Sequence, residues 1–281
     1  MTARRYVLLD VFTDTPLRGN QLAVFDAGQA GAGDELMQEI ARELNLSETV
    51  FLTAPAGAGA DVRARIFTPR VELPFAGHPT LGSAVVHARE QGSASVVIET
   101  GAGLVPVALD WSGKAPLGWM TQPLPEARDC PFSRAALAAL GIKDAEVGPE
   151  IVRQGPEMVL VVLADRTELA SLAPDQGALA ALGEYGFYCA ARAGEAWEVR
   201  MFAPAFGIAE DPATGAGAGA FAAFLVRHGL AGSGEETSIL QGLRIGRDSL
   251  LRARARVHEG RVEHVEVGGN AVVVGSGELR L

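Results

Sequence analysis

The segments RIFTP at residues 65–69 and RMFAP at residues 200–204 are near-copies of each other within one chain. A loop and then a second similar segment follow each copy. This segment is GHPTLG at residues 77–82 in the first copy and EDPATG at residues 210–215 in the second. Both copies combine a β-rich run, a loop and a proline that we expect in the first turn of a helix of small residues. This internal repeat predicts two like domains.

The two predicted helix starts carry different titratable side chains, His78 in the first copy and Asp211 in the second. The amino end of a helix has unpaired N–H groups and a partial positive charge. Two such ends that face one cleft would bind a small anion. We therefore expect a site for an acidic small molecule between the two domains.

Composition excludes several classes of partner. The chain has 281 residues, 48% of them apolar, and a formal net charge of −10. This charge argues against nucleic acid or an anionic membrane as the main partner. No run approaches the ~18 apolar residues of a membrane span, and the first residues lack a signal-peptide pattern, which predicts a cytoplasmic protein. Cys130 and Cys189 lack the spacing of a metal or redox motif, so we expect two reduced, buried thiols.

The pattern along the chain predicts many strands and one long helix in each half. Leu36, Ile40 and Leu44 recur at helical spacing, and we expect Asp34 to cap this amphipathic helix. The central helices, expected to begin at Pro79 and Pro212, are rich in glycine, which costs about 1 kcal/mol per residue in a helix interior. Such helices must gain from close packing. We therefore predict an α+β fold in which a curved, mostly antiparallel sheet wraps a central helix in each half.

The domain boundaries follow from a link and from the tail. Residues 115–118 read as a link, and the tail reads as three strands at residues 250–257, 262–267 and 271–274. We expect the last strand to return to the first domain. The predicted lobes are residues 1–116 with 270–281, and residues 117–269.

Glu48, His78 and Asp211 are the residues that could carry chemistry. Taken singly, Glu48 fits a solvated carboxylate, His78 a structural histidine and Asp211 a helix N-cap. Together they provide three groups of different unperturbed pKa at the ends of elements. A carboxyl group whose pKa is raised by desolvation can remove a proton and return it elsewhere.

Other chemistries find no support in the sequence. The run GAGAG at residues 215–219 is not the G-x-G-x-x-G of a dinucleotide loop, and no P-loop motif is present. The remaining histidines, at positions 87, 228, 258 and 264, lack the spacing of a zinc site. The sequence therefore gives no sign of a metal site.

Five linked motifs resemble the PhzF-like phenazine-biosynthesis family. They are DVFTDTP with GNQLAVF (residues 10–16 and 19–25), NLSETVF (45–51), FTP with GHPTLG (67–69 and 77–82), EDPATG (210–215), and QG with GR (241–242 and 246–247). They occur in order along nearly the whole chain.

The resemblance implies a diaminopimelate epimerase-like fold, with two pseudo-symmetric lobes and the active site in the cleft between them. It also implies a cofactor-independent isomerase that forms a homodimer. The reaction of the phenazine enzyme is isomerisation of a dihydro-hydroxyanthranilate by proton transfer between ring carbons. By residue match, Glu48 is the acid/base that shuttles the proton, and His78 and Asp211 contact and polarise the substrate.

The residues that the resemblance assigns to substrate binding are Ser47, Gly77, Gly215, Ala216 and Asn20. The related epimerases use a cysteine at each helix start, and this chain has none there. The phenazine enzyme has serine at the position of Ala216, and the loss of that hydroxyl removes one hydrogen bond, typically worth about 0.5–1.5 kcal/mol. Two alternatives stay open: an inactive small-molecule-binding protein on the same fold, and a one-base amino-acid epimerase.

Overall fold

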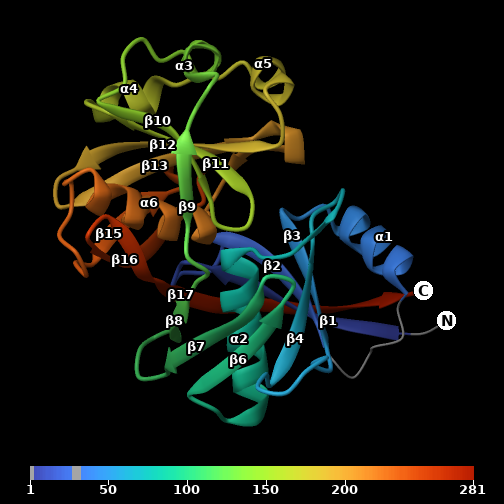
Figure 1. Cartoon of the computed structure of the whole chain (residues 1–281). Helices are drawn as coiled ribbons and strands as arrows, with labels where there is room; N and C mark the ends of the chain where they lie inside the picture. The colour runs from blue at the N-terminus through green and yellow to red at the C-terminus, as the bar shows by residue number, and fades with distance from the viewer. Residues whose placement is uncertain (1–2, 27–32) are drawn as a thin grey trace. The chain divides into compact units, whose positions relative to one another are not determined.

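The computed structural model describes residues 3–26 and 33–281 (Figure 1). Its contacts divide the chain into a first unit, Met1–Thr121 with Gly268–Leu281, and a second unit, Gln122–Val267. The link expected at residues 115–118 lies inside the first unit. Its last residues begin strand β8 (Leu117–Thr121), which pairs with β7 (Gly103–Asp110), so that the hydrogen-bonded ladder carries the boundary past residue 116.

The remaining elements of the first unit follow in chain order. They are β1 (Ala3–Val11), β2 (Asn20–Phe25), α1 (Asp34–Leu44), β3 (Glu48–Thr53), β4 (Val62–Phe67), β5 (Glu72–Leu73), α2 (Gly77–Gln91) and β6 (Ser95–Thr100).

The second unit contains β9 (Glu126–Asp129), α3 (Ser133–Leu140), β10 (Val147–Arg153), β11 (Glu157–Leu163), α4 (Arg166–Ser171), α5 (Gln176–Ala181), β12 (Tyr185–Ala193), β13 (Ala196–Ala203), β14 (Ile208–Asp211), α6 (Gly215–Arg227), β15 (Thr237–Gln241) and β16 (Ser249–His258). The last strand, β17 (Arg261–Arg280), begins in the second unit and ends in the first.

The two units share one order of strand pairing. In the first unit, β1–β2 is antiparallel, β2–β3 parallel, β3–β4 antiparallel and β4–β6 parallel. In the second, β10–β11 is antiparallel, β11–β12 parallel, β12–β13 antiparallel and β13–β15 parallel. Antiparallel pairs predominate in both units, as the sequence predicts. The repeat in the sequence is therefore a repeat in topology.

In each unit, alternate residues of the sheet face two different sets of helices. In the first unit, Phe25, Phe51 and Phe67 pack against Met37 and Ile40 of α1. The side chains between them point to the opposite face of the sheet. That face covers α2, a helix buried along most of its length.

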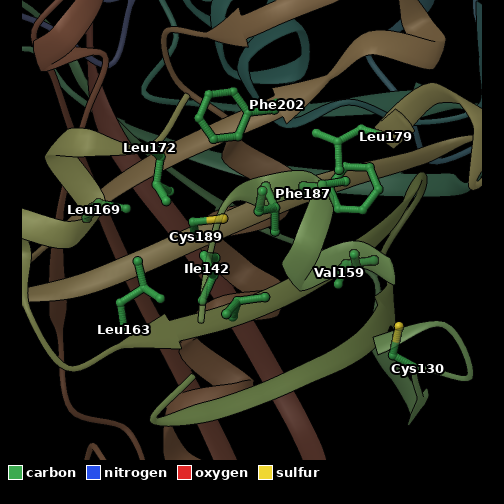
Figure 2. Close-up of a cluster of buried hydrophobic side chains, with 14 of the residues drawn as sticks. Cys130, Ile142, Val159, Leu163, Leu169, Leu172, Leu179, Phe187, Cys189 and Phe202 are labelled. Carbon is green, nitrogen blue, oxygen red and sulfur yellow. The ribbon is translucent and has the colours of Figure 1, made fainter. Parts of the chain in front are cut away.

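The second unit repeats this arrangement with a larger outer core. Val159, Phe187 and Cys189 lie in one cluster with residues of α3, α4 and α5 (Figure 2). The other face of the same strands covers α6, which is buried from Gly215 to Leu225. Cys130 and Cys189 are free and buried, as predicted.

Both central helices are close enough to their strands to require glycine. A Cβ atom on Gly82 would overlap Leu22 Cδ2 of β2, and one on Gly217 would lie 2.6 Å from the ring of Tyr188 on β12. This packing is the gain that the sequence analysis expected from glycine-rich helices.

Three local expectations are wrong. Pro79 lies in the first turn of α2, as expected, but this helix begins at Gly77 rather than at Pro79, and α6 begins at Gly215, so Pro212 lies outside it. Asp34 is the first residue of α1 rather than its cap, and its carboxylate accepts a hydrogen bond of 2.6 Å from Arg65.

The third wrong expectation concerns the tail. Strand β17 runs unbroken through Gly268, whereas we expected two separate strands at residues 262–267 and 271–274. A Cβ atom on Gly268 would lie 2.6 Å from the indole of Trp119, so this glycine permits close packing of a strand. Within the described residues, no helix has the length and apolar character needed to cross a membrane.

Candidate active site

Glu48 occupies the amino end of β3. The parallel ladder pairs it with Leu22 of β2, and Asn20 lies two residues before Leu22. Side chains two residues apart point to the same face of a strand, so Asn20 and Glu48 share the face that covers α2. Both residues are buried.

His78 reaches these two residues because α2 lies close to β2. Gly82 rests against Leu22, and His78 lies one helical turn before Gly82. The two strand residues from Leu22 to Asn20 cover about the same length as this helical turn. His78 therefore lies beside Asn20 at the start of the helix.

A continuous set of contacts joins four of the predicted site residues. Ser47 Oγ donates to Asn20 Oδ1 at 3.0 Å, and Asn20 Nδ2 lies 3.3 Å from His78 Nδ1. His78 Nε2 in turn lies 3.5 Å from Glu48 Oε2. We call Ser47, Asn20, His78, Glu48 and the neighbouring Gly77 the first half-site.

Burial keeps the imidazole of His78 neutral. Desolvation lowers the pKa of His78 to about 3, although a backbone contact with Gln21 opposes the shift. An amide nitrogen only donates, so Asn20 Nδ2 binds Nδ1 in the tautomer of the neutral ring that carries its proton on Nε2. A neutral N–H group then points toward the Glu48 carboxyl group. A buried carboxyl group beside a fixed N–H donor can accept and release a proton.

Asp211 ends β14 and lies before α6 rather than within it. Thr214 Oγ1 donates to Asp211 Oδ2 at 2.5 Å, a short hydrogen bond of the kind that carboxylates accept. The turn between these residues is held by Gln241, which is fully buried at the end of β15.

Gln241 binds the turn at three points. Its Nε2 donates to the carbonyl of Asp211 at 2.8 Å and to Thr214 Oγ1 at 2.9 Å, and its Oε1 accepts from the backbone N–H of Thr214 at 3.1 Å. We call Asp211, Thr214, Gly215, Ala216 and Gln241 the second half-site.

Neither central helix caps its amino end with a side chain. The N-cap residues are Ala76 in α2 and Thr214 in α6, and neither forms a side-chain capping bond. Neither first turn contains an acidic residue. The N–H groups near Gly77 and Gly215 are therefore suited to an external anion.

The second unit has no counterpart of Glu48, as the strand register shows. Thr49 pairs with Phe67 in the first unit, and Phe187 pairs with Phe202 in the second. Because Phe67 and Phe202 are equivalent in the repeat, the residues that precede Thr49 and Phe187 are equivalent too. These are Glu48 and Gly186, so the second unit has no carboxylate at that position.

Two residues of the second half-site were not predicted as site residues from the sequence. Gln241 was noted only as part of a family motif, and Thr214 only as part of the repeat. Their contacts depend on β15 returning beside β13, which pairs residues far apart in the chain. Among residues 3–26 and 33–281, no group of three or more His, Cys, Asp or Glu side chains could hold a metal ion.

Comparisons with known proteins agree with this architecture. Residues 9–277 match the family model described as phenazine biosynthesis-like protein. The trans-2,3-dihydro-3-hydroxyanthranilate isomerase of Pseudomonas aeruginosa is 44% identical over 99% of both chains, and that of Pseudomonas chlororaphis is 42% identical over 98% of this chain and 99% of the relative.

Solved structures show the same fold. A phenazine biosynthesis protein of the PhzF family from Bacillus anthracis matches with a TM-score of 0.85 and 26% identity, covering 100% of both chains. A probable proline racemase from Agrobacterium radiobacter matches in fold with a TM-score of 0.70 and 15% identity over 99% of this chain and 93% of that one. The fold is therefore the predicted epimerase-like α+β fold, and the chain belongs to the phenazine biosynthesis-like (PhzF) family of isomerases.

Proposed function

We propose that the chain isomerises trans-2,3-dihydro-3-hydroxyanthranilate and that Glu48 does so by proton transfer. The relatives that carry this substrate in their names are similar to the chain over nearly its whole length. The observation that carries the proposal is the buried Glu48 carboxyl group 3.5 Å from Nε2 of a neutral His78.

Each residue has a distinct part in the proposed reaction. Glu48 takes a proton from one ring carbon and delivers it to another, so one C–H bond breaks and another forms. His78 and Asp211 bind the polar groups of the substrate and stabilise the charge that develops. The N–H groups near Gly77, Gly215 and Ala216 bind its carboxylate, while Ser47 lines the same site and Asn20 orients His78.

The register supports a proton shift over stereoinversion. A two-base epimerase with equivalent bases in its two units needs a counterpart of Glu48, and Gly186 occupies that position. A one-base epimerase would have to reorient its substrate. Chiral analysis of the product separates this alternative from the isomerase.

The test replaces the carboxyl group of Glu48 by an amide. We expect Glu48→Gln to reduce turnover by about 10²–10⁴-fold, the usual contribution of a general acid/base. The same variant should abolish incorporation of solvent deuterium into the substrate ring, followed by NMR spectroscopy in D₂O.

Glu43→Gln is the matched control, because Glu43 is exposed on α1 and the substitution removes the same charge. It should exchange and turn over at the wild-type rate. Exchange in Glu48→Gln at the wild-type rate would exclude Glu48 as the shuttle. Binding by the wild-type chain without any exchange would favour the inactive binding protein.

We also propose that the enzyme is cytoplasmic, works without a cofactor and forms a homodimer. Two free, buried cysteines suit a reducing compartment, and the net charge of −10 makes nucleic acid an unfavourable partner. The dimer rests on the family resemblance. Light scattering on the purified chain tests it directly.

A further inference from the structure

Tyr188 is a fully buried residue of β12 that the proposed reaction does not use. The ladders pair Tyr188 with Met201, and Met201 with Asp211. Residues directly opposite in antiparallel strands point to the same face of the sheet. Tyr188 and Asp211 therefore lie on one face, in strands separated by β13.

The ring of Tyr188 lies against the first turn of α6. A Cβ atom added to Gly217 would be 2.6 Å from Tyr188 Cε2, and the ring centroid lies 5.5 Å from that of Phe221. The ring is thus fixed by the helix whose amino end belongs to the second half-site.

The hydroxyl group of Tyr188 has no hydrogen-bond partner in the described part of the chain, although it is buried. A buried polar group without a partner destabilises the fold, because it has lost its hydrogen bonds to water. Burial raises the pKa of Tyr188, and the Asp211 carboxylate raises it further. The group therefore stays protonated and can donate a hydrogen bond.

Packing alone does not require this hydroxyl. Phenylalanine would fill the same space against Gly217 and Phe221. The register also identifies Val50 as the equivalent residue of the first unit, because Val50 follows Thr49 as Tyr188 follows Phe187. The fold accepts an apolar side chain at this position.

We propose that Tyr188 is a substrate-binding residue whose hydroxyl donates a hydrogen bond to an anionic oxygen of the ligand held at the amino end of α6. This inference rests on the proposed function and adds a donor to the second half-site, where Ala216 has none. The ligand class is a small carboxylate, and Asp211 and Tyr188 would bind neighbouring polar groups of the same molecule.

The test measures binding separately from turnover. In the Glu48→Gln background, titration calorimetry with trans-2,3-dihydro-3-hydroxyanthranilate should give roughly 10- to 100-fold weaker binding after Tyr188→Phe, as expected for the loss of a hydrogen bond to a charged group. In the active enzyme, which retains Glu48, Tyr188→Phe should raise KM.

Two controls exclude a merely structural effect. Tyr188→Phe should leave the unfolding midpoint of the free protein unchanged or higher, because it removes an unpartnered buried hydroxyl. Tyr185→Phe, on the same strand, removes a hydroxyl that lies 3.5 Å from Arg128 on the protein surface and should bind as the parent does.

The outcomes separate this inference from the proposed function. If the wild-type chain converts the substrate and Tyr188→Phe binds it as tightly as its parent, only the role of Tyr188 is overturned. If the wild-type chain neither binds nor converts the substrate, the proposed function fails and this inference fails with it.

Discussion

At the scale of single residues, the burial of His78 has a large electrostatic effect in the first half-site. Its pKa of about 3 lies below the ordinary value of 6.5, so the unfolded chain binds a proton that the folded chain rejects. This contribution to stability is complete above pH 6.5 and is lost as the pH falls toward 3. At pH 5 the loss should be about 2 kcal/mol relative to pH 7.

Urea unfolding at pH 7 and pH 5 measures this loss, with His78→Gln as the reference that cannot titrate. The difference in unfolding free energy between the two pH values should be about 2 kcal/mol smaller in the variant. Equal pH dependence in both proteins would show that His78 titrates in the folded chain as it does in the unfolded one.

Sequence alone identified Glu48, His78, Asn20 and Ser47, and the structure brings these four together. It did not identify Tyr188 or Gln241. A single tyrosine in an apolar strand is indistinguishable from a core residue. Its unpartnered hydroxyl becomes visible only when α6 and β14 are placed around it.

At the scale of elements, the approach of α2 to β2 sets the position of His78. Alanine in place of glycine normally stabilises a helix interior by about 1 kcal/mol. Gly82→Ala should have the opposite sign and destabilise the protein by roughly 1–3 kcal/mol, because its Cβ atom would overlap Leu22 Cδ2. The displaced helix should also lower kcat.

A double-mutant cycle with Leu22→Ala checks the cause, by chemical unfolding and by activity. Shortening Leu22 makes room for the added methyl group, so the double variant should lose less than the two single losses added together. Additive losses would mean that Gly82 acts through something other than this contact.

Short elements were the least predictable from sequence. Helices α4 and α5 contain six residues each, too few to show a helical period. Their signals are local: Asp165 caps the backbone N–H of Thr167, and Asp175 caps that of Ala178. The start of α6 was misplaced because Pro212 lies in a turn held by Gln241. The hydrogen bonds between Gln241 and this turn join residues far apart in the chain, so no local sequence pattern reveals them.

At the scale of the whole molecule, each of the two units contains its own copy of one ion pair, so the repeat extends to this interaction. Arg65 binds Glu72 through Nε and Nη2, and Arg200 binds Glu210 through the same two atoms. Each guanidinium also lies over the phenylalanine two residues further on, at 5.2 Å and 5.0 Å. The pairs differ in exposure, because Glu72 is 40% exposed and Glu210 only 11%.

This difference in exposure predicts that replacing Arg200 destabilises the protein more than replacing Arg65. Arg200→Met leaves the mostly buried side chain of Glu210 without its partner, and the carbonyl of Leu172, at the end of α4, without its 2.7 Å donor. It should lower the protection of amides in β12 and β13 against hydrogen exchange by about 3–5 kcal/mol. Arg65→Met breaks a more exposed pair and should lower the protection of β3 and β4 by about 1 kcal/mol. The two bidentate geometries are the same. Equal losses of protection would therefore mean that this geometry, and not the burial of the pair, determines its contribution to stability.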